Sequence, residues 1–284
     1  MTAYIWISSD LQLGRPEVAR SVLANAVDDV LSLGLPLVGA WCLGDALVGA
    51  DLAALDEVAA LSVELYERLG VPVCYVMGNH EMDLRRSRGV NRFPMYERVR
   101  SRPGWHTLPS LSALYFSVEV AGHRVFFLGD HADEAGRWFT VAGSVKGEAP
   151  EAYPHGPDAY RRLRQAIAAS VQPVLIASHY AFRGGQRAGA LQDALLPLPA
   201  NVRAHFHGHA HIGDLVWNRE NPWSRVNPIE GSPIRQFNVS ALETERTEGS
   251  HSAFLAVHGD GRLAIRFRCH VQRAWIGEYT IERG

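Results

Sequence analysis

The sequence predicts an α/β fold built on a mostly parallel sheet, and the pattern of its first 77 residues is the main evidence. Apolar runs at 4–8, 37–43 and 71–77 alternate with amphipathic patterns at 16–33 and 51–69. The apolar runs have the length of buried strands, and the longer patterns have the period of helices. A β-α-β-α-β order places the strands in parallel and covers the sheet with helices.

The later part of the chain continues this alternation. Ala121-Gly122-His123 and Gly259-Asp260-Gly261 each separate two strand-like runs and predict hairpins, the second at about 252–270. The elements expected here are strands at 113–120 and 124–129, a helix at 157–170, strands at 173–178 and 202–207, and hairpin strands at 253–258 and 263–268.

Two Pro- and Gly-rich stretches, 140–157 and 218–234, are expected to be long loops. Neither has the composition of a linker, and the sequence contains no internal repeat. We therefore expect one domain over residues 1–284, with the C-terminal hairpin as part of it.

The composition is that of an ordinary globular protein, with 47% hydrophobic and 20% charged residues among 284. A net charge of -2 gives no basic field, so nucleic acid is not an expected partner. The apolar runs are too short to span a membrane, and the Met-Thr-Ala start lacks a basic secretory segment. Cys42, Cys74 and Cys269 have no paired spacing and are expected to be packed thiols. The expected location is the cytoplasm, and the oligomeric state stays open.

Five short polar segments each follow directly on a predicted strand. Loops at the carboxyl ends of parallel strands converge on one crevice, so these segments are expected to meet. Their carboxylates, amides and imidazoles suit divalent ions such as Mn, Fe, Zn or Co, and two such ions roughly 3.5–4 Å apart form a hydrolytic site for phosphoryl groups. The segments are Asp10-Leu11-Gln12, Gly44-Asp45, Gly78-Asn79-His80-Glu81, Ser178-His179 and Gly208-His209-Ala210-His211.

Each segment alone also has an ordinary structural interpretation. Asp10 could cap a helix, Asn79 could stand in a turn, and His209 and His211 could be exposed loop residues. The five in order favour a metal site over coincidence. His205 and His207, on alternate positions before this last pair, are expected to be packed residues or to support the site indirectly.

The order of the segments resembles the calcineurin-like metallophosphoesterase superfamily, whose pattern runs D-x-H, G-D, G-N-H-[ED], H, G-H-x-H. The match covers residues 10–211 and implies a four-layer α/β/β/α sandwich with mixed sheets and the metals at the carboxyl ends of strands. It also implies that His80 and Asn79 are catalytic, with His80 bonded to a phosphoryl oxygen or protonating the leaving group. The implied metal ligands are Asp10, Gln12, Asp45 and His211 for one ion, with Asp45 bridging, and Asn79, His179 and His209 for the other.

Two positions depart from the family pattern. Gln12 replaces the His of D-x-H, which predicts a weaker first metal. This D-x-Q variant resembles manganese-dependent ADP-ribose/CDP-alcohol pyrophosphatases and favours Mn. Val48 replaces the second Asp of G-D-x-x-D, so His80 is expected to lack an acidic partner and to be a weak general acid. Substrates whose leaving group is already a stable anion, phosphoanhydrides or activated diesters, are therefore expected.

The implied activity is hydrolysis of a phosphodiester or nucleotide pyrophosphate by a hydroxide that bridges two metal ions. The expected substrate is a small phosphorylated compound, with nucleotide derivatives as candidates. A phosphomonoesterase and a cyclic-nucleotide or phospholipid-type diesterase are alternatives within the enzymes. A catalytically silent scaffold that only binds metal is the alternative from another class.

A basic stretch at 84–104 supplies candidate substrate contacts. Its seven Arg stand against one acid, Glu97, and it begins close to His80. Arg forks match phosphate oxygens, so Arg85 and Arg86 are predicted to bind substrate. Arg88 is a candidate for another phosphate contact, and Arg98, Arg100 and Arg102 are expected to form a solvated helix face. Tyr180 and Phe182 are candidate base contacts. Trp217 and Trp223 could stack a base or cap the site, but ordinary aromatic packing is expected of them. Asp130 and His131 are expected to cap a helix or to support the site.

Overall fold

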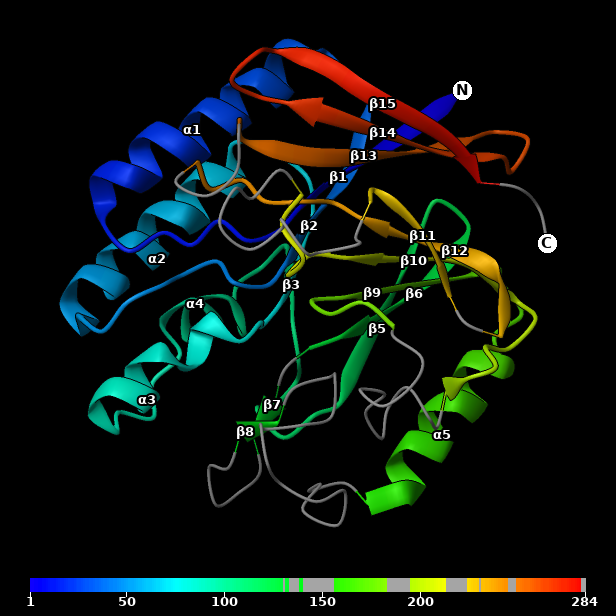
Figure 1. Cartoon of the computed structure of the whole chain (residues 1–284), viewed down its shortest axis with the longest axis horizontal. Helices are drawn as coiled ribbons and strands as arrows, with labels where there is room; N and C mark the ends of the chain where they lie inside the picture. The colour runs from blue at the N-terminus through cyan, green and yellow to red at the C-terminus, as the bar shows by residue number, and fades with distance from the viewer. Residues whose placement is uncertain are drawn as a thin grey trace.

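The computed structural model describes residues 1–129, 131–132, 138–139, 156–182, 195–212, 224–229, 231–244 and 249–281 (Figure 1). Over this part of the chain, two large sheets are covered by helices on their outer faces. The helices are α1 (Pro16–Ser32), α2 (Leu52–Glu67), α3 (Asp83–Arg88), α4 (Pro94–Val99) and α5 (Gly156–Ala168), with a 3₁₀ turn η1 (His80–Met82).

The first sheet has seven strands in the order β15-β14-β13-β1-β2-β3-β4. Neighbours from β1 to β4 are parallel, and β13, β14 and β15 extend the sheet in antiparallel fashion. The register pairs Ser8 with Cys42 and Cys42 with Tyr75, so the residues after β1, β2 and β3 share one edge. The strands are β1 (Thr2–Ser8), β2 (Leu37–Leu43), β3 (Val73–Val76), β4 (Trp105–His106), β13 (His251–His258), β14 (Leu263–Cys269) and β15 (Ala274–Ile281).

The second sheet has six strands in the order β11-β12-β10-β9-β6-β5. Its four central strands are parallel, and the two edge strands, β11 and β5, are antiparallel to their neighbours. A separate two-stranded pair joins β7 to β8. The strands are β5 (Tyr115–Val120), β6 (His123–Leu128), β7 (His131–Ala132), β8 (Trp138–Phe139), β9 (Val174–Ser178), β10 (Val202–His207), β11 (Val226–Ile229) and β12 (Ser232–Asn238).

The layers follow from where each face buries its apolar side chains. Ile7 and Trp41 of the first sheet pack against Phe127 and Phe206 of the second, and together they form the core between the sheets. A second cluster joins the first sheet to α1, α2 and α4, and a third joins the second sheet to α5. Figure 1 shows α1 to α4 on one side of the sheets and α5 on the other. The predicted four-layer α/β/β/α sandwich is therefore confirmed.

Helix termini explain two of the predicted boundaries. α1 begins at Pro16, whose fixed φ and missing N–H suit a first helical position. α2 begins one residue later than expected because Asp51 is its N-cap, and the Asp51 carboxylate accepts from the backbone N–H of Ala53 and Ala54.

A buried ion pair fixes α1 to the far strands of the first sheet. The carboxylate of Asp29 accepts two hydrogen bonds from the Arg268 guanidinium, at 2.8 and 2.7 Å, and a third from His270 Nδ1 at 2.8 Å. All three side chains are buried. Burial alone would raise the pKa of Asp29, but these hydrogen bonds outweigh it and lower that pKa. The carboxylate therefore stays ionised against its cationic partner.

The stretch 218–234 was wrongly predicted to be a loop throughout. β11 occupies Val226–Ile229, and β12 begins at Ser232. Pro228 argues against a strand at this position in the sequence, because proline has no N–H to donate. β11 is an edge strand, where the missing N–H is tolerated. Most of the other predicted loop, together with Asp130, Trp217 and Trp223, lies outside the described residues, as does the side chain of His131. α3, β4, β7, β8, β12 and β15 were not predicted, and the helix face expected at Arg98, Arg100 and Arg102 overlaps only the end of α4.

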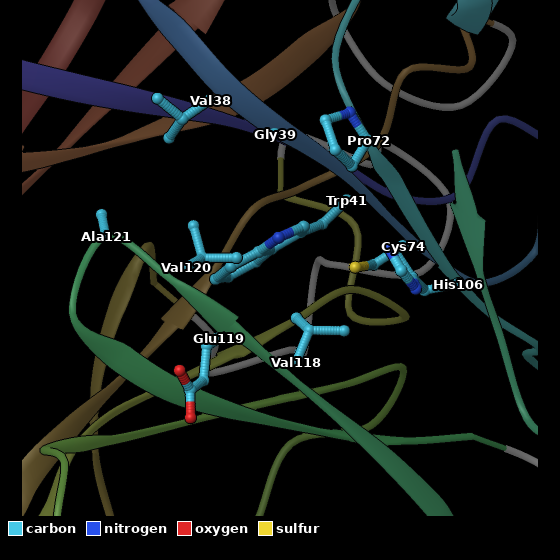
Figure 2. Close-up of a pocket in the computed structure, with 10 residues that line it drawn as sticks. All are labelled: Val38, Gly39, Trp41, Pro72, Cys74, His106, Val118, Glu119, Val120 and Ala121. Atoms are coloured by element: carbon cyan, nitrogen blue, oxygen red, sulfur yellow. The ribbon is translucent and has the colours of Figure 1, made fainter. Parts of the chain in front are cut away.

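A pocket of about 200 Å³ lies at the opposite end of the sandwich from the polar segments (Figure 2). It is formed by the beginning of β2, the residues around the start of β3, β4 and the end of β5. Its inner lining is apolar, with Trp41, Val118 and Val120 among the ten residues drawn in Figure 2. Glu119 is exposed, and it bonds Arg124 and Gln172 instead of converging with other polar groups on the pocket. We therefore assign no chemistry to this pocket.

The three cysteines are buried and unpaired, as predicted. Burial raises the pKa of the Cys42 thiol to about 12, so it is not a reactive thiolate at neutral pH. Among the helices of the described residues, none combines the length and the apolar composition that crossing a membrane requires.

Candidate metal centre

The five polar segments converge where the carboxyl ends of the two sheets meet. Hydrogen bonds connect them directly: Asp10 N–H donates to Gly44 O at 3.0 Å, and Gly208 N–H donates to His179 O at 3.1 Å. Two further bonds cross between the sheets, from His209 N–H to Asp10 Oδ2 at 2.8 Å and from His179 Nδ1 to Leu43 O at 2.8 Å. The predicted convergence of residues about two hundred positions apart is therefore present.

One group of candidate ligands surrounds Asp45. Potential ligand atoms of Asp45, His179 and His209 all lie within 4.8 Å of one another. Asn79 Oδ1 lies 3.3 Å from His179 Nε2 and belongs to the same group. Because His179 Nδ1 donates to a backbone carbonyl, its Nε2 is left to face the group, the arrangement that a metal-ligating imidazole needs.

A second group contains Asp10, Gln12 and His211. His211 Nε2 lies 2.8 Å from Asp10 Oδ1 and 3.3 Å from Gln12 Nε2. On its other side, His211 Nδ1 donates to the buried carboxylate of Glu243 at 3.1 Å. Glu243 therefore fixes the ring so that Nε2 points toward Asp10. Sequence reasoning missed Glu243, since it lies in a distant loop and in no motif.

The carboxylates of both groups carry strong electrostatic shifts. Burial would raise the pKa of Asp10, but the charge of His211, and then that of His179, lowers it well below its usual range. Burial likewise opposes ionisation of Asp45, and the charge and hydrogen bond of His179 lower the pKa of that carboxyl. Both carboxylates are therefore anionic although they are buried, a strong attraction for cations.

The backbone is strained at four candidate ligands. Left-handed φ angles occur at Asp10 (52°), Gln12 (48°), Asp45 (51°) and His209 (61°). A side chain at such an angle costs roughly 1–2 kcal/mol. Strain of this kind persists where the surroundings impose it, and it gathers at functional sites.

Two glycines of the motifs lie so close to candidate ligands that no side chain fits at either position. A Cβ on Gly208 would lie 1.8 Å from Ser9 Oγ and 2.4 Å from Asp10 Oδ2. A Cβ on Gly78 would lie 2.5 Å from Asp45 Oδ1. Neither position accepts a side chain without displacing a candidate ligand.

Glu81 joins two of the loops. Its carboxylate accepts from the backbone N–H of Gly78 at 2.7 Å, Ala46 at 2.8 Å and Asp45 at 3.1 Å. Burial, together with the charge of Asp45, raises the pKa of Glu81 to about 7. Glu81 is thus the acidic end of the G-N-H-E segment that holds the loop of Asp45 in place.

The expectation that His80 lacks an acidic partner is wrong. Asp83, three residues along the chain, lies with Oδ2 at 2.9 Å from His80 Nδ1. The same oxygen accepts from Gly49 N–H at 3.3 Å, so it lies beside the position where Val48 interrupts G-D-x-x-D. Burial alone would lower the pKa of His80, but the hydrogen bond to Asp83 and the charge of Asp45 raise it. His80 N–H also donates to Asp45 Oδ1 at 2.7 Å.

Of the two predicted substrate contacts, the structure describes the side chain of Arg85 and not that of Arg86. Arg85 is half-buried, and its Nη1 is a buried atom without a hydrogen-bond partner; no contact of the described residues joins it to the two ligand groups. The side chain of Arg86 lies outside the described residues. Farther along the basic stretch, Arg92 pairs with Glu97. Arg98, Arg100 and Arg102 are exposed, as expected of a solvated face, and Arg102 pairs with Glu67.

The residues after His179 divide between the site and the core. Phe182 is buried and stacks on His205, with ring centroids 4.2 Å apart, so the prediction that it contacts a base is wrong. His205 and His207 are fully buried, as predicted. Tyr180 is half-buried and faces the candidate ligands, with its hydroxyl 3.1 Å from Asn79 Oδ1.

Comparison with known families decides the classification. The family model for calcineurin-like phosphoesterases matches residues 4–213, most of the chain. The chain belongs to the calcineurin-like phosphoesterase family. As a calcineurin-like phosphoesterase it is a hydrolase of phosphoesters. Among curated proteins, none matches the chain.

Solved structures share the calcineurin-like phosphoesterase fold at low sequence identity. A dimetal phosphatase from Danio rerio aligns with a TM-score of 0.63 and 14% identity, over 99% of each chain. A purple acid phosphatase from yellow lupin seeds aligns with a TM-score of 0.64 and 12% identity, over 99% of this chain and 54% of the lupin chain. GAP50, the anchor in the inner membrane complex of Plasmodium, aligns with a TM-score of 0.59 and 10% identity, over 99% of this chain and 89% of the GAP50 chain. At these identities the likeness shows the fold.

Proposed function

We propose that this phosphoesterase uses two divalent metal ions to hydrolyse a phosphodiester or phosphoanhydride bond in a small substrate, with nucleotide derivatives as the leading candidates. One observation carries the proposal: the His80–Asp83 pair lies directly beside the ligand group of Asp45, His179 and His209. A proton donor and a cation site at one point are what cleavage of a phosphoester requires.

The donor set fits two ions. Two buried carboxylates, two amides and three imidazoles suit borderline-hard divalent cations, and Mn is the ion that the D-x-Q resemblance favours. When bound, the ions supply positive charge for the phosphoryl oxygens and an activated water. We propose that Asp10 and His211 hold the first ion with Asp45. Gln12 would join them with its amide turned so that Oε1 takes the place of Nε2, the end that faces His211 in the structure. Asn79, His179 and His209 would hold the second, with Asp45 bridging.

The chain itself supplies the proton for the leaving group. His80 Nδ1 is held by Asp83, so the imidazole presents Nε2 as the donor, and the neighbouring carboxylate favours the protonated ring. We assign to His80 the protonation of the leaving oxygen, or a hydrogen bond to the phosphoryl group as it gains charge. Arg85 stays a candidate for holding a second phosphate of the substrate.

The His80–Asp83 pair widens the range of leaving groups that we expect the substrate to have. A weak general acid at His80 was the reason to restrict the leaving group to stable anions, and Asp83 removes that reason. Alcohol leaving groups, which need a proton, therefore come within reach beside nucleoside phosphates. Gln12 continues to favour the pyrophosphatase branch through its resemblance alone.

Metal analysis with a Mn-supplemented substrate panel tests the proposal. The panel contains ADP-ribose, CDP-choline, cyclic AMP, bis-nitrophenyl phosphate and mono-nitrophenyl phosphate. We expect about two ions per chain, and turnover of at least one diester or pyrophosphate that exceeds turnover of the monoester. Stoichiometric metal with no turnover of any compound would favour the silent scaffold instead. His80→Ala separates the two further, because an enzyme loses most of its turnover and a scaffold keeps its metal and its function.

A further inference from the structure

Tyr180 contacts three of the four residues to which the proposed function assigns the second ion. Its hydroxyl donates to Asn79 Oδ1 at 3.1 Å. Its ring lies against His179, with centroids 5.0 Å apart and planes at 83°, and against His209, at 4.5 Å and 49°. Tyr180 is thus the side chain that ties these candidate ligands together.

The contact with Asn79 matters because an amide has two unlike ends. Only the oxygen can ligate a cation, and the NH₂ end repels it. The Asn79 oxygen has two lone pairs, so it can accept from the Tyr180 hydroxyl with one and face an ion with the other. The rotated amide would lose the tyrosine donor and turn its N–H groups toward the cation.

A buried polar network of the second sheet fixes the backbone around Tyr180. Ser178 Oγ donates to Tyr180 O at 2.7 Å and contacts His205 Nε2 at 2.7 Å. Gln236 bonds both the N–H and the carbonyl of Phe182, at 2.9 Å each, and lies 3.3 Å from His205 Nδ1. The backbone that carries Tyr180 is therefore held on both sides by the second sheet, which also gives His205 a structural purpose.

From this geometry we propose that Tyr180 is a positioning residue of the second metal site: its hydroxyl holds the Asn79 amide with the oxygen toward the cation. The inference rests on the proposed function for the identity of the site, but it concerns cation binding and needs no turnover. Partners that orient a metal ligand typically change metal affinity by 10- to 100-fold when they are removed.

Mn²⁺ binding to the full chain tests the inference. Tyr180→Phe keeps the ring against both imidazoles and removes only the hydroxyl. We expect it to weaken the second of two Mn²⁺ binding steps about tenfold or more in calorimetry, and to reduce the spin-coupled dinuclear signal in electron paramagnetic resonance. The matched control is Tyr4→Phe in the first half of β1, which pairs with Leu37 at the start of β2 and so lies toward the opposite end of the sheet from the site; it should bind Mn²⁺ like the wild type.

A second background shows whether the hydroxyl acts through the amide. In Asn79→Asp both ends of the side chain are oxygens, so there is nothing left to orient. Tyr180→Phe in that background should change Mn²⁺ affinity less than about threefold, against tenfold with Asn79 present. An equal loss in both backgrounds would mean that Tyr180 acts by packing, and the inference would be wrong.

Three other results would overturn the inference about Tyr180, the proposed function, or both. Unchanged Mn²⁺ binding in Tyr180→Phe overturns the inference, and if KM for the substrate rises at the same time, the hydroxyl contacts substrate instead. Two Mn²⁺ per chain without hydrolysis of any panel substrate would refute the proposed function and leave the Tyr180 result standing. A wild-type chain that binds no Mn²⁺ would overturn both.

Discussion

Replacing Asp83 by Asn should slow the reaction most for substrates with poor leaving groups. Asn keeps the size of the side chain and removes the charge that fixes and polarises His80. A hydrogen bond to a charged group contributes about 1.5–3 kcal/mol. The His80 and Asp83 side chains are 26% and 22% exposed, so solvent screens the pair and the low end applies. About 1.5 kcal/mol corresponds to roughly a tenfold loss of kcat.

The assay compares kcat for two phosphodiesters that differ only in the leaving group, a nitrophenolate and an alkyl alcohol. Asp83→Asn should reduce the alkyl reaction about tenfold and the nitrophenyl reaction much less, because the stable anion needs no proton. Moving the carboxylate provides a rescue: Val48→Asp added to Asp83→Ala should restore part of the lost rate, since Asp83 Oδ2 already lies 3.3 Å from Gly49 N.

Equal losses for both leaving groups would refute this reasoning, because Asp83 would then support the loop and not proton transfer. Mn²⁺ stoichiometry serves as the control. It should not change in Asp83→Asn, because Asp83 belongs to neither ligand group.

Three further predictions concern stability and metal binding. Asp29→Asn leaves Arg268 buried without its anion and should lower the free energy of unfolding in urea by about 3–5 kcal/mol at pH 7. Folding lowers the pKa of Asp29, so the stability that its carboxylate contributes is present above about pH 4 and is lost as the pH falls through the pKa of the folded state. The unfolding free energies of the wild type and Asp29→Asn should therefore become equal in acid and stay different in base. Gly208→Ala should abolish calorimetric Mn²⁺ binding, whereas Gly39→Ala, whose Cβ would meet nothing closer than 3.7 Å, should bind normally. Gln12→His should tighten the first ion and shift metal preference in a protein that stays folded; unchanged stoichiometry and rate would mean that Gln12 is not a ligand.

Much of the fold follows from local patterns in the sequence. β2 and β10 have the predicted bounds, and α1 and α2 differ by a residue or two, because apolar period and capping residues are local signals. β11 was missed because its Pro228 argues against a strand unless the strand is known to lie at an edge. Edge position is a property of the assembled sheet and is not written in the segment itself.

The candidate ligands were predictable because each follows a strand, and parallel strands end at one place. Their supporting partners were not. Glu243 reaches His211 from a loop thirty-two positions later, and Asp83 replaces a partner expected at position 48 by way of the turn after His80. Such contacts depend on the path that a loop takes in space, which residue type and spacing do not encode.

The left-handed backbone at Asp10, Gln12, Asp45 and His209 has a consequence for how this protein responds to selection. Glycine adopts that conformation without strain, so glycine in place of Gln12 or His209 would relieve roughly 1–2 kcal/mol while removing a ligand. At Asp10 and Asp45 the same change would also lose the hydrogen bonds that these carboxylates accept from His209 N–H and His80 N–H. A library screened for thermal tolerance alone would therefore be enriched in chains that have discarded the metal centre. Hydrolytic activity has to be selected together with stability if both are to survive.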